Sequence, residues 1–269
     1  LWGWLLVFGW PVPVRAATHS EPPLSAHMIV HRALEKAQAA EEADTRARFT
    51  FTLTTLVEDL DGKGNVKTRR EKVYRARVCQ GWTRLVLVRR NGKDLTPSQA
   101  QREEEKDLQF RRQATQSASL LGSDRRDGFF TPELTHRYRF ALQGTETVNG
   151  RPAYILRFFP RDPDLPIKKA PERLLNQISG TIWIDREELE VARVDCKLTG
   201  EVNLWGGLLA SLKKLECRLE RVRVAEGIWF NREFTGQLSG RKLADPFRMR
   251  VSSSSTNFVE AAAEPAKAP

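Results

Sequence analysis

Alternation of apolar and polar residues constrains the fold of this chain more than any other sequence feature. In the segment GTIWIDREELEVARVDCKL, residues 180–198, apolar side chains occupy alternate positions on both sides of a charged run. Successive side chains of a β-strand point to opposite faces of a sheet, so this spacing predicts strands with one apolar and one polar face. The charged run at 186–190 predicts a turn, and the whole segment is therefore expected to form a β-hairpin.

The same alternation recurs along most of the chain between residues 48 and 258. Turn signals such as Asp61-Gly62, Asn91-Gly92 and Asn149-Gly150 separate the alternating segments. No hydrophobic repeat with a period of about 20–50 residues is present, which excludes a solenoid. We therefore expect about nine to eleven antiparallel strands in meander order.

Three segments have a helical pattern instead. Residues 24–44 carry one apolar stripe at helical spacing, with Ser25 as a candidate N-cap. Residues 97–118 begin with Pro97 after the candidate N-cap Thr96, and their thin apolar stripe predicts a charged helix on the surface. A short helix through Leu174-Leu175 is expected after a loop.

A sheet with one apolar face must cover that face, whereas its other face carries arginines on most strands, for example Arg75, Arg77 and Arg193. Three helical segments are too few to cover so many strands as a flat layer. We therefore predict a mainly β (α+β) fold, a half-open antiparallel β-barrel with helices covering the concave face. Side chains fill the enclosed space, or an acyl chain can enter it.

Nine aromatic residues on the inward positions are the candidates for lining such a cavity. They are Phe49, Phe51, Tyr74, Tyr138, Phe140, Tyr154, Phe158, Phe230 and Phe234. Each of these side chains can instead belong to an ordinary packed core.

An apolar turn is expected within NLWGGLLASL, residues 203–212. Trp205, Leu208 and Leu209 flank a pair of glycines there. Exposed apolar side chains of this kind can contact a membrane or a protein partner. The turn can equally fold back over the cavity as a lid.

Two of the three cysteines test the strand register. If the turn is centred between Gly206 and Gly207, Cys196 pairs with Cys217 and Val194 pairs with Leu219. The apolar rows then match without adjustment, which supports this pairing. The two cysteines can form a disulfide in an oxidising compartment or remain two buried thiols.

Residues 1–16 are mostly apolar, and prolines interrupt them. This run is too short for a membrane span of about 20 residues. It fits the apolar part of a secretory signal with a small-residue cleavage site at Val14-Arg15-Ala16, and a retained N-terminal anchor is the alternative. We expect an exported protein with a folded domain at 17–258 and a disordered tail at 259–269.

No catalytic or cofactor motif stands out. His27 and His31 are four residues apart but lack the HExxH pattern, and neither a Gly-x-Ser-x-Gly elbow nor a Walker loop is present. The net charge of +10 does not indicate nucleic-acid binding, because the expected aromatic face lies opposite the basic face. We predict a protein that is not an enzyme, needs no cofactor or metal, and binds no nucleic acid.

The phrase GTIWID at 180–185 and the segment EGIWFNREFTGQLSGR at 226–241 resemble the periplasmic lipoprotein-carrier family of the LolA/LolB type and its lipoprotein-sorting relatives. The resemblance spans about residues 26–258 and implies an incomplete antiparallel barrel, lidded by helices, that shelters acyl chains. It implies a periplasmic protein that carries or sorts lipoproteins or lipids toward the outer membrane. The alternative is an envelope lipid sensor of the same fold, acting through an inner- or outer-membrane protein. We expect a monomer.

Overall fold

The computed structural model describes residues 24–43, 48–79, 82–116, 136–162, 170–204, 210–243 and 245–261. The described helices are α1 (Ala26–Ala43), α2 (Pro97–Gln116) and α4 (Ala170–Leu175). The strands are β1 (Phe49–Leu60), β2 (Val66–Cys79), β3 (Trp82–Arg90), β4 (Lys93–Asp94), β5 (Tyr138–Val148), β6 (Arg151–Pro160), β7 (Ile178–Asp185), β8 (Val191–Leu198), β9 (Val202–Leu204), β10 (Ala210–Ala225), β11 (Ile228–Lys242) and β12 (Asp245–Glu260).

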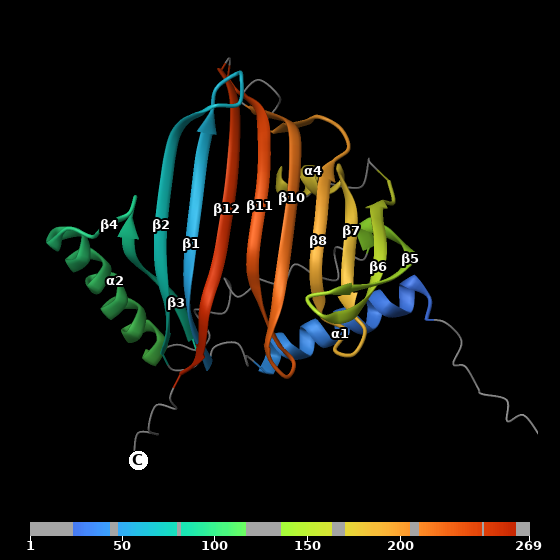
Figure 1. The fold of residues 1–269 in the computed structure, drawn as a ribbon, viewed down its shortest axis with the longest axis horizontal. Helices are drawn as coiled ribbons and strands as arrows, with labels where there is room; N and C mark the ends of the chain where they lie inside the picture. Colours follow the sequence, from blue (N-terminus) through green and yellow to red (C-terminus); the bar gives the residue numbers. More distant parts are fainter. Residues whose placement is uncertain are drawn as a thin grey trace, which may run out of the picture.

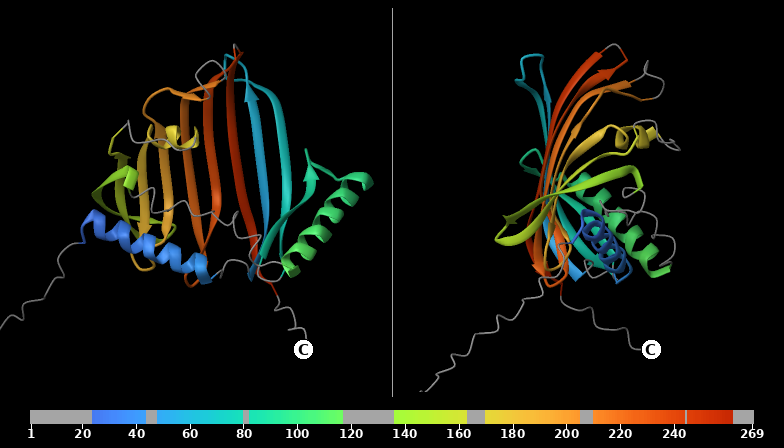
Figure 2. Two further views of the ribbon diagram at one scale, coloured as in Figure 1. Left: turned by 180° about the vertical axis from the view of Figure 1, so that it is seen from behind. Right: turned by 90° about the vertical axis from the view of Figure 1, so that its right-hand side faces the viewer.

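All described strands belong to one antiparallel sheet of twelve strands, in the order β4-β3-β2-β1-β12-β11-β10-β8-β7-β6-β5, with β9 paired to β10 (Figure 1). The sheet is strongly curved and its two edges, β4 and β5, lie at opposite ends of the molecule (Figures 1 and 2). The predicted mainly β fold and half-open barrel are therefore confirmed, with twelve strands where about nine to eleven were expected.

Two meanders build this sheet. Strands β1 to β4 form the first, strands β5 to β12 form the second, and the pairing of β1 with β12 joins them in the middle of the sheet. The join runs from the Phe49–Glu260 pair to the Asp59–Met249 pair. The first and last strands of the chain are thus central strands, and β12 continues past the predicted end of the folded domain at residue 258.

Helix α1 begins where the sequence predicts and covers part of the concave side of the sheet (Figure 2). The Ser25 hydroxyl caps its first turn by accepting a hydrogen bond of 3.2 Å from the backbone N–H of Met28. Ile29, Val30 and Ala33 form its buried stripe. They pack against apolar side chains of β5 to β8, β10 and β11 and make the main core of the molecule.

Helix α2 lies beside the other edge of the sheet and contacts β3 (Figure 1). Thr96 and Gln99 form a reciprocal cap, because the backbone N–H of Gln99 donates to the Thr96 hydroxyl at 3.4 Å and the backbone N–H of Thr96 donates to the Gln99 side chain at 3.1 Å. Only one side of α2 meets the sheet, as its thin apolar stripe predicts.

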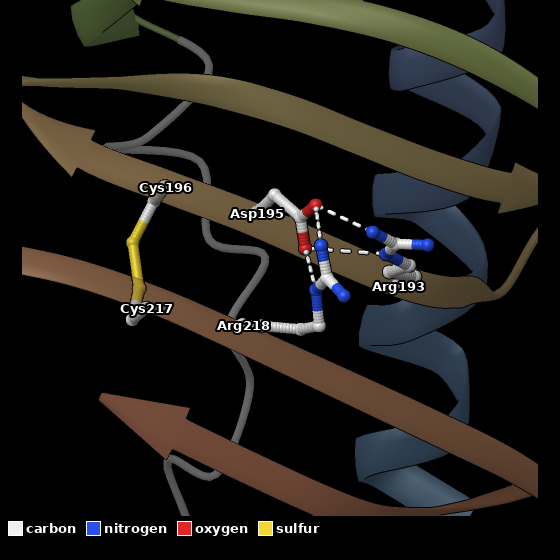
Figure 3. Close-up of a disulfide and its surroundings, with 5 residues drawn as sticks. All are labelled: Arg193, Asp195, Cys196, Cys217 and Arg218. Carbon is white, nitrogen blue, oxygen red and sulfur yellow. Dashed lines mark hydrogen bonds and ion pairs between the residues drawn. A yellow bond between two sulfur atoms is a disulfide. The ribbon is translucent and has the colours of Figure 1, made fainter. Parts of the chain in front are cut away.

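The predicted hairpin at 180–198 forms β7 and β8, and the predicted register of β8 against β10 is confirmed. Cys196 pairs with Cys217 and Val194 pairs with Leu219. The two cysteines are joined by a disulfide with a Cα–Cα distance of 5.2 Å, which Figure 3 shows between the two strands.

Several sequence predictions lie outside the described residues. These are the signal at 1–16, the apolar turn with Trp205, Leu208 and Leu209, and the tail from residue 262 onward. Among the residues that the structure describes, no helix combines the length and the apolar character that a membrane crossing needs.

Candidate functional site

The concave face carries a cluster of four phenylalanines at the join of the two meanders, which we call the aromatic cluster. Its members are Phe49 and Phe51 on β1, Phe230 on β11 and Phe258 on β12. The ring centroid of Phe230 lies 5.8 Å from that of Phe49, 5.4 Å from that of Phe51 and 5.1 Å from that of Phe258. Phe49 is buried, whereas the other three are half-buried, so the cluster still presents apolar surface.

A separate group of apolar side chains lies on the same face, nearer the other end of the central strands. Cross-strand partners share a face of the sheet, so Leu215 on β10, Leu238 on β11 and Met249 on β12 stand side by side. Val57 on β1 is paired with Val251 on β12 in the next row of this face, two residues nearer the aromatic cluster along each strand. All five side chains are only partly buried, which distinguishes this half of the face from the half under α1.

A second aromatic group belongs to the core under α1. The ring centroids of Tyr138 and Phe158 lie 5.2 Å apart in an edge-to-face arrangement, and Phe140 lies 6.5 Å from Phe158. The Tyr138 hydroxyl donates a hydrogen bond of 2.6 Å to the backbone carbonyl of Leu175 in α4. Burial raises the pKa of Tyr138 to about 12, so this hydroxyl stays protonated and holds α4 on the concave side.

The nine aromatic residues predicted as lining therefore fall into distinct environments. Tyr138 and Phe158 are buried in the core, and Phe140, Tyr154 and Phe234 pack against it. Phe49, Phe51 and Phe230 form the aromatic cluster, and Tyr74 is paired with Leu53 on the same face as Val57. Their role in holding a ligand stays a prediction.

Sequence reasoning missed Phe258, which completes the aromatic cluster. Phe258 lies 5.6 Å from Phe51 between ring centroids. It follows the polar run SSSSTN, and nothing in that run indicates which strand pairs with β12. Phe258 could have been included if the strand had been extended past the serines. Strand β12 must continue to Glu260 to pair with the start of β1.

Glycine makes room for rings that lie across strands of the concave face. A Cβ atom on Gly180 would clash with the backbone carbonyl of Asp195 and come within 2.9 Å of the Phe158 ring. On β11, a Cβ atom on Gly240 would come within 3.0 Å of the Phe247 ring. The glycine of the GTIWID phrase therefore has a packing role, since it lets Phe158 cover β7.

The outer face carries paired charges, as the alternation predicts. Asp195 accepts hydrogen bonds from Arg193 at 2.6 Å and from Arg218 at 2.9 Å (Figure 3). Burial alone would raise the pKa of Asp195, but these two hydrogen bonds hold the pKa below its usual value. A depression of about 430 Å³ on this face is bordered by Asp195, Arg218 and Arg250. The arginines and the aromatic cluster thus lie on opposite faces.

A small apolar cluster on the outer face was not expected from the sequence. Trp183, Trp229 and Ala153 are buried there together with Val148 and Ala192. Within this cluster, the indole N–H of Trp229 donates a hydrogen bond of 2.6 Å to the carboxylate of Glu188. The same carboxylate accepts a hydrogen bond of 2.6 Å from Arg223. Strand alternation assigned Trp183 to the polar face. Its cluster includes Val148 of β5 and Trp229 of β11, whose positions the local pattern does not give.

Among the described residues, no group of three or more His, Cys, Asp or Glu side chains is placed to hold a metal ion. His27 and His31 lie on the exposed side of α1 with ring centroids 6.2 Å apart. His31 contacts Glu35 one turn further along at 3.4 Å. This geometry is that of a solvated helix surface.

Comparison with known proteins gave matches among solved structures only; no protein-family model and no curated protein matches this chain. An outer membrane lipoprotein-sorting protein domain from Vibrio parahaemolyticus is 13% identical, with a TM-score of 0.35, over 88% of this chain and 95% of that one. A LolA superfamily protein from Nitrosomonas europaea is 11% identical, with a TM-score of 0.34, over 91% of this chain and 96% of that one. The structure of the Pseudomonas aeruginosa MucA/MucB complex is 12% identical, with a TM-score of 0.23, over 86% of this chain and 100% of the matched chain. These matches include proteins of the group that the sequence motifs resemble.

Proposed function

We propose that this chain is a periplasmic, non-catalytic binding protein that holds an acyl chain of a lipid or lipoprotein on its concave face and carries or sorts it toward the outer membrane. The observation that carries the proposal is the half-buried aromatic cluster, together with the partly buried apolar side chains further along the same strands. Rings of Phe51, Phe230 and Phe258 present apolar surface on the inside of a curved sheet, where a flexible chain can be sheltered from water.

The energetics suit reversible binding. An acyl chain gains about 0.8 kcal/mol for each CH₂ group removed from water, so sheltering most of one chain contributes several kcal/mol. The face is long enough in the strand direction, since β10, β11 and β12 have 16, 15 and 16 residues. Helix α1 covers the far half of the face and leaves the aromatic cluster outside its core. Release then requires an acceptor that binds the acyl chain more tightly.

The test is native mass spectrometry of the protein extracted gently from the bacterial envelope. We expect a co-purified lipid or acylated peptide in the unmodified protein. Phe51→Ser should abolish or strongly reduce this bound mass, because it puts a hydroxyl into the aromatic cluster. Phe159→Ser is the matched control, since Phe159 is 38% exposed and follows Phe158 on β6, so that it points to the outer face.

Equal lipid content in all three proteins, or none in any of them, contradicts the proposal. Thermal unfolding of each variant separates lost binding from lost folding. Capture of a membrane protein by lipid-free protein would favour the sensor alternative instead.

A further inference from the structure

A basic pocket lies between α2 and the hairpin of β2 and β3, on the face of the sheet opposite the aromatic cluster. Arg77 on β2 and Arg84 on β3 are cross-strand partners, so they share a face of the sheet. On β2, Arg77 alternates with Ala76 and Tyr74. Both arginines therefore point to the face opposite the one that carries Tyr74. Helix α2 contacts this opposite face and places Asp107 next to both arginines.

Three guanidinium groups surround the single carboxylate of Asp107. The distances from Asp107 oxygens are 3.2 Å to Arg77 Nη1, 3.6 Å to Arg84 Nη1 and 2.9 Å to Arg111 Nη2. Asp107 is 5% exposed, so it is buried beneath the three arginines. The one carboxylate is therefore shared among three guanidinium groups.

Arg84 is the group whose hydrogen bonding is incomplete. Its side chain is only 12% exposed, and its Nη1 atom is buried without a hydrogen-bond partner among the described residues. The 3.6 Å separation from Asp107 is too long for a hydrogen bond. A buried donor without an acceptor is costly, so an acceptor in the pocket would relieve a defect of the folded state.

The pocket has room for such an acceptor. Its cavity measures about 220 Å³, and Thr50, Val78, Phe110 and Ala261 complete the lining. The Phe110 ring lies 5.8 Å from the Arg84 guanidinium carbon and shields one side of it from water. A water molecule takes about 30 Å³ in the liquid, so the cavity admits a tetrahedral anion with a few waters.

We propose that this pocket binds a phosphate group, with Arg84 as the central ligand and Arg77 and Arg111 at its rim. A guanidinium fork matches the spacing of phosphate oxygens and makes two parallel charge-assisted hydrogen bonds to them. The phosphate belongs to a free anion or to a phospholipid headgroup that reaches the surface of α2. This site is independent of acyl-chain binding on the concave face.

The experiment measures binding of inorganic phosphate to the full chain by calorimetry at low ionic strength. Arg84→Met should weaken phosphate binding at least tenfold. Arg89→Met is the matched control, because Arg89 lies on the same strand and pairs with the exposed Asp94, and it should leave binding unchanged.

Asp107→Asn gives a test that loss of stability cannot imitate. Removal of the carboxylate takes away a negative charge that repels phosphate, so phosphate should bind about threefold or more tightly and raise the melting temperature more than in the unmodified protein. If Asp107 only anchors α2, Asp107→Asn will bind neither phosphate nor phosphatidylglycerol vesicles more tightly than the unmodified protein, which contradicts the proposal.

A second arm separates the two sources of phosphate. Vesicles of phosphatidylglycerol and phosphatidylcholine are compared with vesicles of phosphatidylcholine alone, using the full chain and Arg84→Met. Arg84-dependent binding to the phosphatidylglycerol vesicles, without binding of inorganic phosphate, assigns the site to a headgroup. Binding of inorganic phosphate assigns it to a free anion. Absence of Arg84-dependent binding in both arms overturns the proposal.

Discussion

Asp185, the last residue of β7, shows how one buried carboxylate fixes the tip of a hairpin. It is fully buried and accepts hydrogen bonds from Arg151 at 2.7 and 3.1 Å. The backbone N–H groups of Glu188 and Glu187 donate to it at 2.7 and 3.0 Å. Burial alone would raise the pKa of Asp185, but the hydrogen bonds from Arg151 and from these backbone groups lower it below 3.8.

We predict that Asp185→Asn lowers the free energy of unfolding by about 1.5–3 kcal/mol near neutral pH, because it removes the buried charge partner of Arg151 and leaves only the exposed carboxylate of Glu187. The folded-state pKa of Asp185 lies below its unfolded value, so its stabilisation is complete above pH 3.8 and is lost as the pH falls through the folded-state pKa. The difference between the two proteins should therefore shrink in acid.

Urea unfolding of both proteins at several pH values measures this difference. Lys214→Met is the control, because Lys214 and Glu216 are both 52% exposed and their ion pair should contribute only about 0–1 kcal/mol. A difference that stays constant into strong acid would show that Asp185 acts by shape and not by charge.

At the scale of elements, glycine on a strand sets how closely a ring can cover the backbone. Gly180 is paired with Cys196 on β8 and with Phe158 on β6, and it has no positive φ that would require glycine. Its role is therefore space: the Phe158 ring takes the volume that a side chain would need. The core under α1 is built on this contact.

We expect Gly180→Ala to lower the free energy of unfolding by about 1–3 kcal/mol or more, because the added methyl group meets both backbone and ring. The matched control is Gly62→Ala in the turn between β1 and β2, where a Cβ atom meets nothing within 4 Å. The control should change stability by less than about 1 kcal/mol. Thermal unfolding of the two variants tests this, and equal effects would refute the packing role.

At the scale of the whole molecule, the second meander carries a covalent link. The Cys196–Cys217 disulfide ties β8 to β10 across a sequence separation of 21 residues. A link of this kind restricts the unfolded chain more than the folded one, and a loop of about this length is typically stabilised by 2–4 kcal/mol in this way. The disulfide also lies next to the outer-face charges of Asp195 and Arg218 (Figure 3).

We predict that the double variant Cys196→Ala/Cys217→Ala loses about 2–4 kcal/mol of unfolding free energy under oxidising conditions. Added reductant should destabilise the unmodified protein by a similar amount and leave the double variant unchanged. Guanidinium unfolding with and without reductant makes the comparison. A reductant effect of equal size in both proteins would exclude the disulfide as its cause.

Local patterns predicted much of this fold. The alternation gave the strands and their faces, and the apolar rows around Cys196 and Cys217 gave the register of β8 against β10. The caps at Ser25 and Thr96 located the starts of two helices. These features depend on neighbours in sequence or on a single hairpin, so a one-dimensional pattern contains them.

Long-range pairings account for what the sequence did not predict. The aromatic cluster forms only because β1 lies beside β12. Trp183 of β7 is buried in one cluster with Trp229 of β11, which is distant in sequence. The basic pocket needs Asp107 of α2 against Arg84 of β3, whereas the sequence predicted only that this helix lies on the surface. The local sequence of these segments does not specify their partners. Pairing of distant strands depends on how the whole sheet packs, and not on the spacing of apolar residues within one strand.

The β1–β12 pairing has a consequence for the order in which a newly made chain can mature. Synthesis delivers β1 early, but its neighbour in the middle of the sheet arrives only with the last strand, which ends at Glu260. Before β1 and β12 pair, the chain can form only two half-sheets whose long edges are unpaired, and their closure has the high contact order that slows folding. A stop codon just upstream of β12 would leave the edges of β1 and β11 open to association with other chains. Pairing of β12 with these two strands therefore protects the molecule from aggregation.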